Sequence, residues 1–205
     1  IEIGEKVNII GGSPTGVIID NISFKFTGGH GVGFGTCADV TVTNCIFSWI
    51  GGSVLSYNDG GFVTNYGNAI EIYGGCSGYD VKNNWIYQIY DTAITHQISA
   101  GSVGNTHMRD ILYKDNLMEY CHWSIEYYNN PGGGGKRTVD NVQVHHNVLR
   151  RGGYGWGSAG RASGAALFNS FVLPWETENF NSFCNIYDRC AGGIIRFYEG
   201  GDRKI

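Results

Sequence analysis

Hydrophobic and polar residues alternate along the chain in short runs, and one run recurs three times between Tyr66 and Tyr128. Its copies read GNAIEIYGG (67–75), DTAITHQ (91–97) and HWSIEYY (122–128). Alternation with a period of two, rich in Ile and Tyr, predicts strands. Alignment of the copies gives an aliphatic column, a polar column and a mostly aromatic column: Ile70–Ile94–Ile125, Glu71–Thr95–Glu126 and Tyr73–Gln97–Tyr128.

A longer unit repeats along almost the whole chain. Its first part is a pair of short strands, read at 20–26, 39–47, 79–87, 109–119, 140–149 and 179–187. Its second part is the strand described above, read at 31–35, 68–73, 92–97, 123–128, 164–169 and 193–198. Strands this short cannot bury a face alone, whereas stacked coils bury a continuous core. The repeat predicts an all-β solenoid of about six coils.

An Asn recurs near the junction of the paired strands, at Asn44, Asn84, Asn116, Asn147 and Asn185. Asn tolerates left-handed backbone, and stacked Asn side chains can pair along a solenoid axis. We therefore interpret these five residues as structural. In the second part of the unit, the acids of the polar column belong to the middle coils alone. We expect Gly33, Phe168 and Arg196 at the same outward position in other coils.

From about Val17 to Tyr198, this pattern resembles the right-handed parallel β-helix repeat of the pectate-lyase-like superfamily. The phrase GNAIEIYGGCSGYDVKNNWIYQIYDTAITHQ is similar to β-helix proteins grouped with glycoside hydrolases and polysaccharide lyases. Tailspike and adhesin β-helices share the repeat. The resemblance implies a right-handed parallel β-helix that binds an oligo- or polysaccharide.

The chain has 205 residues, 42% of them hydrophobic, which is enough for one well-buried domain over 1–205. It begins at Ile1 and not at Met, so we expect a mature form or a piece of a longer protein. Exposed solenoid ends are adhesive, and we expect flanking sequence, self-association or a partner chain to cover them. The carbohydrate-active resemblance implies a secreted or cell-surface protein.

Composition excludes several other classes. A net charge of −4 offers no basic footprint for nucleic acid, and no apolar run reaches membrane-spanning length. The cysteines at 37, 45, 76, 121, 184 and 190 have no metal-ligand spacing, so we expect buried free thiols. No Asp-rich loop predicts a calcium site, and we expect no metal and no cofactor.

Inserted segments flank the repeated strand on both sides, and loops are where solenoids carry function. Segments 51–66 and 150–163 precede the strand, and segments 98–107, 129–138 and 170–178 follow it. They could form two walls of a groove whose floor is the Glu71–Thr95–Glu126 column.

Glu71 and Glu126 are the candidate catalytic pair. Neighbouring coils lie about 4.8 Å apart. The two glutamates are two coils apart, so their Cα atoms should be about 9–10 Å apart. This borders the spacing at which an inverting glycosidase places a water between its base and the sugar, and is wide for a retaining enzyme. The alternative is that both are solvated glutamates on an outward strand.

Asp91 and His122 each lie three residues before an aligned Ile, so we expect them on adjacent coils at the turn that leads onto the floor. An Asp beside a His gives a general acid or base, or a ligand for a sugar hydroxyl. Glu119 is a lesser candidate at the same turn. His96 has inward parity, which predicts a core histidine. His30 lies in GGHGVGFG, similar to the GHG element of polygalacturonases, whose NTDG and RIK elements are missing here.

The aromatic column predicts a sugar-binding surface made of Tyr73, Tyr128 and Tyr198, with Gln97 and Trp123 nearby. Aromatic faces contact sugar rings while polar side chains bind hydroxyls. The alternative is a plain aromatic ladder. Arg196 could bind a carboxylate or sulfate.

Together these patterns favour a glycoside hydrolase with Glu71 and Glu126 as acid and base, supported by Asp91 and His122. One alternative is a polysaccharide lyase on uronic-acid polymers, although the floor has acids where a lyase needs cations. Another is a glycan-binding or adhesion module without catalysis, similar to a tailspike segment.

Overall fold

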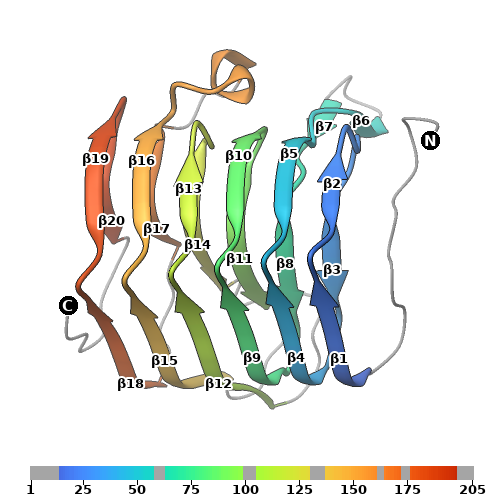
Figure 1. Cartoon of the computed structure of the whole chain (residues 1–205), viewed down its shortest axis with the longest axis vertical. Helices are drawn as coiled ribbons and strands as arrows, with labels where there is room; N and C mark the ends of the chain where they lie inside the picture. Colours follow the sequence, from blue (N-terminus) through green and yellow to red (C-terminus); the bar gives the residue numbers. More distant parts are fainter. Residues whose placement is uncertain are drawn as a thin grey trace.

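The computed structural model describes residues 14–57, 63–98, 105–129, 137–160, 164–171 and 176–197. Each coil contributes one strand to each of three parallel sheets, as Figure 1 shows from the side of the stack. The chain is therefore a parallel β-helix of six coils, which confirms the solenoid predicted from the repeat. Tyr198 lies outside the described residues.

The three sheets, here named A, B and C, follow one another around every coil. Sheet A contains β1 (Thr15–Asp20), β4 (Ala38–Thr43), β9 (Ser77–Lys82), β12 (Thr106–Lys114), β15 (Arg137–His145) and β18 (Glu176–Phe183). Sheet B contains β2 (Ser23–Lys25), β5 (Ile46–Ile50), β10 (Trp85–Ile89), β13 (Leu117–Glu119), β16 (Val148–Gly152) and β19 (Ile186–Cys190). Sheet C contains β3 (Val32–Phe34), β8 (Ile70–Tyr73), β11 (Thr92–Ile98), β14 (Trp123–Asn129), β17 (Ala166–Phe171) and β20 (Gly193–Phe197).

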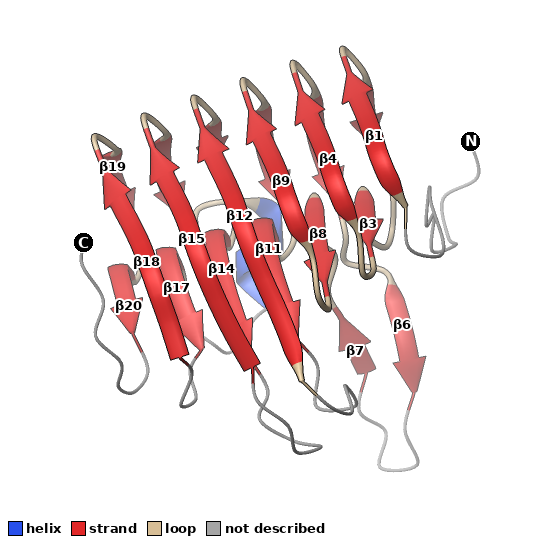
Figure 2. Ribbon diagram, turned by 90° about the horizontal axis from the view of Figure 1, so that it is seen from below, coloured by secondary structure: helices blue, strands red, loops and turns tan. Residues whose placement is uncertain are grey.

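Three described elements, a pair of strands and a short helix, lie outside the stack, and all three are in segments that break the repeat. The strands β6 (Val54–Tyr57) and β7 (Val63–Asn65) form an antiparallel pair between sheets B and C of the second coil. The 3-10 helix η1 (Trp156–Gly160) lies between sheets B and C of the fifth coil. In Figure 2, η1 is the blue helix seen behind the strands of sheet A.

The core is made of inward columns that run through all coils. On sheet C, one column reads Val32–Ile70–Ile94–Ile125–Phe168–Ile195. On sheet B, the register stacks Phe47, Ile86, Met118 and Leu149, each fully buried. This packing of apolar columns between three sheets holds the coils in one register and fixes which side chains of sheet C face outward.

Left-handed backbone recurs at three places around the coil: in or just after the strands of sheet B, at the corner between sheets A and B, and within the strands of sheet A. All sixteen described non-glycine residues with positive φ fall into three columns: Phe26–Trp49–Gln88–Tyr120–Arg151–Arg189, Asn21–Asn44–Asn83–Asp115–His146–Cys184, and Asp39–Asp110–Asn141–Asn179. Asn and Asp dominate the last two columns because their short polar side chains tolerate this conformation.

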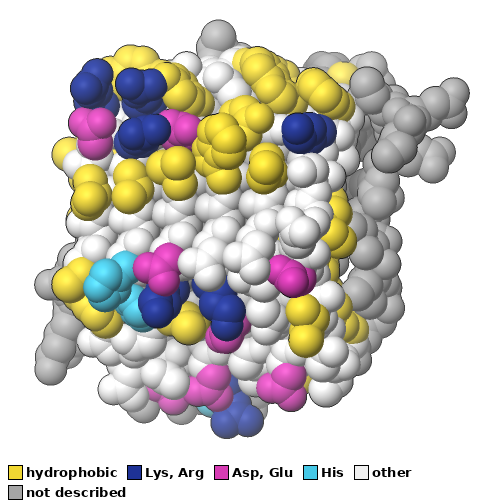
Figure 3. Space-filling model, viewed as in Figure 1, with side chains coloured by type: hydrophobic (Ala, Val, Ile, Leu, Met, Phe, Trp, Pro, Cys, Tyr) yellow, Lys and Arg dark blue, Asp and Glu magenta, His cyan; other side chains and the backbone are white. Residues whose placement is uncertain are grey.

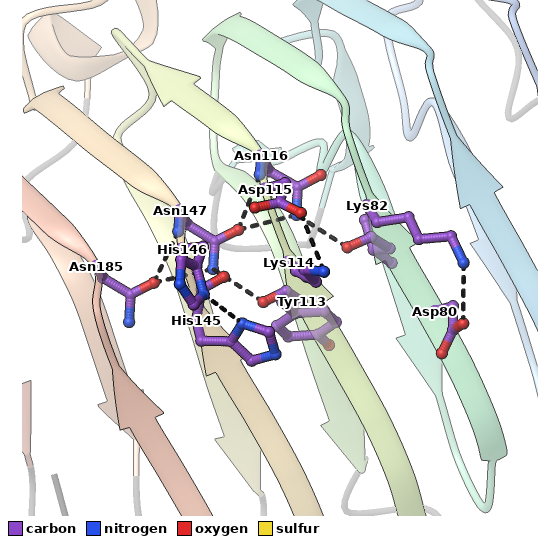
Figure 4. A network of polar contacts seen from close by, with 11 residues as sticks. Asp80, Lys82, Tyr113, Lys114, Asp115, Asn116, His145, His146, Asn147 and Asn185 are labelled. Carbon is purple, nitrogen blue, oxygen red and sulfur yellow. Dashed lines mark hydrogen bonds and ion pairs between the residues drawn. The ribbon is translucent and has the colours of Figure 1, made fainter.

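A buried asparagine ladder follows the second of these columns, at the corner between sheets A and B (Figure 4). The Nδ2 of Asn116 donates to Val81 O (2.9 Å) and to Oδ1 of Asn147 (3.0 Å), and the next step joins Asn147 to Asn185 in the same way. Asn84 begins the ladder by donating to Asn116. The predicted pairing along the solenoid axis is thus confirmed for these four residues.

Asn44 does not join the ladder, so the predicted pairing was wrong for this residue, whereas the predicted left-handed backbone is confirmed for Asn44 and not for the other four. Asn44 has a φ of 54°, which places it in the left-handed column, where its Nδ2 donates to Asp20 at 2.8 Å on the surface. Cys45 takes the ladder position, and its backbone N–H donates to Oδ1 of Asn84. Asn suits both the left-handed position and the ladder position, so the sequence alone does not show which of the two Asn44 occupies.

Candidate functional site

The register of sheet C confirms the aligned columns. Thr95 of β11 pairs with Glu71 of β8 on one side and with Glu126 of β14 on the other. The same pairing aligns three fully buried isoleucines and the outward column Tyr73–Gln97–Tyr128. Glu71 and Glu126 therefore face away from the core, two coils apart, with Cα atoms about 9–10 Å apart at the spacing of parallel strands.

The polar column continues in both directions as Gly33 before Glu71 and as Asn169 and Arg196 after Glu126. The prediction of Phe168 at this position was wrong, because Phe168 pairs with Ile125 and is 3% exposed. Residues 165–168 are all apolar and all buried, so alternation does not reveal the inward side there. The prediction for Arg196 is confirmed.

Glu126 is a buried carboxylate, 5% exposed, that accepts hydrogen bonds from the preceding coil. Its Oε2 accepts from Thr95 Oγ1 at 3.0 Å, from Gln97 Nε2 at 3.2 Å and from Thr92 Oγ1 at 3.4 Å. All three partners are neutral donors on β11, and such donors suit an ionised carboxylate. Gln97 also donates to Thr95, at 3.1 Å, which fixes both side chains.

Glu71 is held by the first coil, which precedes its own, and by its own turn. Its Oε2 lies 2.8 Å from Nδ1 of His30 and accepts from Nδ2 of Asn68 at 2.8 Å. The backbone N–H of Asn68 also points at Nδ1 of His30, at 3.1 Å. This nitrogen either donates a hydrogen bond to Glu71 or accepts one from the backbone N–H of Asn68, so the tautomer of His30 decides which of the two bonds forms.

The two carboxylates lean the same way along the solenoid axis. Glu126 contacts the coil before its own, and Glu71 contacts His30 in the coil before its own. Gly33, which has no side chain, stands beside Glu71 in the column and leaves room for this lean. The carboxyl groups therefore keep about the two-coil spacing of their Cα atoms.

Asp91 and His122 occupy neighbouring coils, as predicted. The backbone N–H of Trp123 donates to Asp91 O at 3.1 Å, which sets the register of the two coils. Asp91 is 6% exposed and His122 is 2% exposed. Nδ1 of His122 lies 3.2 Å from Oγ of Ser158 in η1. The turn that leads onto the floor is therefore closed by η1.

The predicted sugar-binding residues lie at different depths. Tyr73 is 36% exposed, Gln97 and Tyr128 are half-buried, and Trp123 is 4% exposed. The indole Nε1 of Trp123 and the Nη1 of Arg196 both donate to Gly164 O, at 3.1 and 2.6 Å. Trp123 thus acts as a support of the floor, whereas Tyr73 offers an aromatic surface beside Glu71.

Two other candidates lie away from this floor. Glu119 belongs to sheet B, where it accepts from Trp85 Nε1 at 2.9 Å and pairs with Arg150 at 2.8 Å. His96 faces inward as predicted, is 1% exposed, and lies 2.9 Å from the hydroxyl of Tyr113. His30 is the residue whose role sequence reasoning missed. Only its GHG context drew attention to it, and nothing in the sequence joined it to Glu71.

An aromatic hollow of about 320 Å³ lies near η1, lined by Phe26, Trp49 and Trp156 together with Thr27, Gly28, Gly51, Gly52 and Ser53. Trp156 donates from Nε1 to Gln88 O at 2.8 Å and packs against Tyr90. Hydrophobic side chains also form a row across the outer face of sheet B in Figure 3. The remaining predicted walls, in segments 98–107, 129–138, 161–163 and 170–178, lie wholly or largely outside the described residues.

Among the described residues, no group of three or more His, Cys, Asp or Glu side chains is placed to hold a metal ion. The described part of the chain also contains no helix long and apolar enough to cross a membrane.

Comparison with known proteins gives no assignment: no protein-family model, curated protein or solved structure matches the chain significantly. The fold therefore stands on the sheet topology, which is that of a parallel β-helix. The resemblance to the pectate-lyase-like superfamily and the activity it implies are taken up as proposals below.

Proposed function

We propose that this protein is a carbohydrate-active enzyme, a glycoside hydrolase that cleaves an oligo- or polysaccharide bound along the outer face of sheet C. The observation that supports this proposal best is the pair of carboxylates, Glu71 and Glu126, in one outward column two coils apart. Each carboxylate accepts hydrogen bonds from neighbouring side chains, whereas a pair of solvated surface glutamates would be hydrated by water instead. Strands also disfavour Glu, which makes two in one column notable.

We assign the general acid to Glu71 and the general base to Glu126. Glu71 contacts Nδ1 of His30, a group that can hold or return a proton. Glu126 accepts three bonds from neutral donors, which suits a carboxylate that takes a proton from water. The carboxyl groups keep about the two-coil spacing, which is too wide for a retaining enzyme and borders the range of inverting enzymes, so the proposed reaction proceeds with inversion of the anomeric carbon. Asp91 and His122 support the floor at its turn.

Tyr73 is the proposed sugar platform, with Gln97 and Tyr128 in the same column, and Trp123 and Arg196 beside them. An exposed aromatic ring gives apolar area to a sugar, while amides bind its hydroxyls. A polymeric substrate fits a protein that is secreted or at the cell surface, which we retain as part of the proposal.

The proposal is tested by incubating the protein with a panel of neutral and acidic polysaccharides. We expect new reducing ends, and we expect the NMR spectrum of the first product to show the inverted anomer. Products that absorb in the near ultraviolet would support a polysaccharide lyase instead. Glycan binding without any product would support a binding or adhesion module.

A further inference from the structure

Two cysteines meet in the core between sheets C and A. The Sγ of Cys37 donates to the Sγ of Cys76 at 3.0 Å, and the two residues are 5% and 1% exposed. Cys37 precedes β4 and Cys76 precedes β9, and the backbone N–H of Ser77 donates to Cys37 O at 3.0 Å. The pair therefore occupies equivalent positions on neighbouring coils.

We propose that Cys37 and Cys76 are a disulfide-forming pair that cross-links the second coil to the third on oxidation. Parallel neighbours about 4.8 Å apart fall within the Cα separations of roughly 4.4–6.8 Å that a disulfide spans. The sulfur atoms are already in contact, so closure needs a shift of about 1 Å to the S–S bond length. This inference is independent of the proposed enzymatic activity.

The remaining cysteines lack such a partner position. Cys121 and Cys190 share a column but flank Gly152, so they lie two coils apart, about 9–10 Å, beyond disulfide reach. Cys45 stacks on Asn84 in the ladder, and Cys184 follows His146 in the left-handed column. Of the six cysteines, all of which the structure describes, Cys37 and Cys76 alone are neighbours in one column.

The surroundings of the two thiols also shift their pKa values in opposite directions, which bears on thiol–disulfide exchange. The hydrogen bond from Cys37 lowers the pKa of the Cys76 thiol, and the same bond together with burial raises the pKa of Cys37. This direction favours Cys76 as the attacking sulfur, because the thiolate is the nucleophile.

The reaction needs an oxidant, for which we name a low-molecular-weight disulfide such as oxidised glutathione. The Cys76 thiolate attacks one sulfur and displaces one glutathione thiolate, which takes up the proton that Cys76 lost. Cys37 then loses its proton, and its thiolate attacks the Cys76 sulfur of the mixed disulfide and displaces the second glutathione thiolate, which takes up that proton. Two protein thiols and one oxidised glutathione yield one protein disulfide and two reduced glutathione molecules.

The cross-link lies at the end of the strand that carries Glu71 and Tyr73. Cys76 follows Tyr73 directly after the turn, and the bond would close a loop of 39 residues that includes β8. Oxidation should therefore stabilise the protein by restricting the unfolded chain.

The test compares wild type with Cys37→Ser, Cys76→Ser and the control Cys121→Ser. Each protein is exposed to oxidised glutathione both folded and during refolding from urea, then alkylated and mapped by mass spectrometry. We expect wild type and Cys121→Ser to lose two alkylated cysteines and to yield a Cys37–Cys76 cross-linked peptide. Oxidation should raise their melting temperature by roughly 5 °C or more.

Neither serine variant at the pair should show the cross-link or the rise in melting temperature. The proposal is overturned if wild type keeps six alkylated cysteines under both conditions. It is equally overturned if the cross-link joins another pair, or if Cys76 ends as a stable glutathione adduct with Cys37 still reduced.

Discussion

Nδ1 of His30 lies 2.8 Å from Oε2 of Glu71, and this contact joins the turn before β3 to the outward column of sheet C. The same nitrogen is approached by the backbone N–H of Asn68, so it can serve one of the two partners at a time. The state of His30 is thereby coupled to that of the carboxylate that we assign as the general acid. His30 contacts Glu71 and acts through it as a positioning residue.

His30→Asn should lower kcat by at least about tenfold while changing KM little, because the imidazole orients Glu71 and exchanges a proton with it. The pH profile of kcat should also shift, which a merely structural role would not cause. Steady-state kinetics at several pH values measure both effects. His107→Asn is the matched control, because His107 is exposed on sheet A. Equal profiles for wild type and His30→Asn would contradict the assigned role.

Asn116→Ala should lower the free energy of unfolding by about 3 kcal/mol or more, because Val81 O and the amide of Asn84 both lose their buried partner. Asn44→Gly should change it by less than about 1 kcal/mol, since glycine accepts the left-handed backbone of that exposed position. Urea denaturation of both variants measures the difference. Similar losses would show that the ladder position of Asn116 has no special importance.

Gly157→Ala should detach η1 from the third coil. A Cβ at this position would lie 2.5 Å from both Cα and O of Tyr90, and neither backbone atom can move aside cheaply. We expect a loss of about 1–3 kcal/mol in stability from this overpacking. Ser158→Ala removes only the contact with His122 and serves as the comparison. Thermal melts that rank Ser158→Ala as the more damaging change would argue against the docking described.

Stability should fall on acidification partly through His145. Partial burial, His146 and Lys114 lower the pKa of His145 below its usual 6.5, while Asp115 opposes them. The unfolded chain therefore binds the proton more tightly, so the contribution of this residue is complete above pH 6.5 and is lost as the pH falls through 6.5 toward the lower folded value.

His145→Gln should accordingly lose less stability than wild type between about pH 7.5 and pH 5. The difference should be small because the ring is partly exposed. Denaturant titrations at the two pH values measure it, with His107→Gln as the control that should behave as wild type does. A larger loss of stability in His145→Gln than in wild type would contradict a lowered pKa of His145 in the folded protein.

The fold was predictable because the repeat carries the same information six times. The alignment of Ile70, Ile94 and Ile125 fixed the parity of sheet C, and with it the outward position of Glu71 and Glu126. The prediction that Phe168 faces outward was wrong because consecutive apolar residues are all buried there, so alternation does not distinguish the two sides. The position of Asn44 was misjudged because Asn suits two adjacent positions.

The surroundings of the two acids were much less predictable. Contacts within sheet C, such as that of Thr95 with Glu126, follow from register alone. The approach of His30 to Glu71 depends on how a turn folds, and the closure of His122 by Ser158 depends on an insertion from another coil. The turn that holds His30 and the insertion that holds Ser158 do not repeat from coil to coil, so neither contact leaves a periodic signal in the sequence.

The most direct test of the account is the turnover of Glu71→Gln and Glu126→Gln on the polysaccharide that wild type cleaves, measured as reducing ends released. Both variants keep the size and shape of the side chain, and Asp188→Asn on sheet B controls for loss of a surface carboxylate. We predict a loss of at least about 100-fold in kcat for each glutamate variant, with unchanged circular dichroism and melting temperatures within a few degrees of wild type. Full activity in both folded variants would contradict the assignment of Glu71 and Glu126 as acid and base.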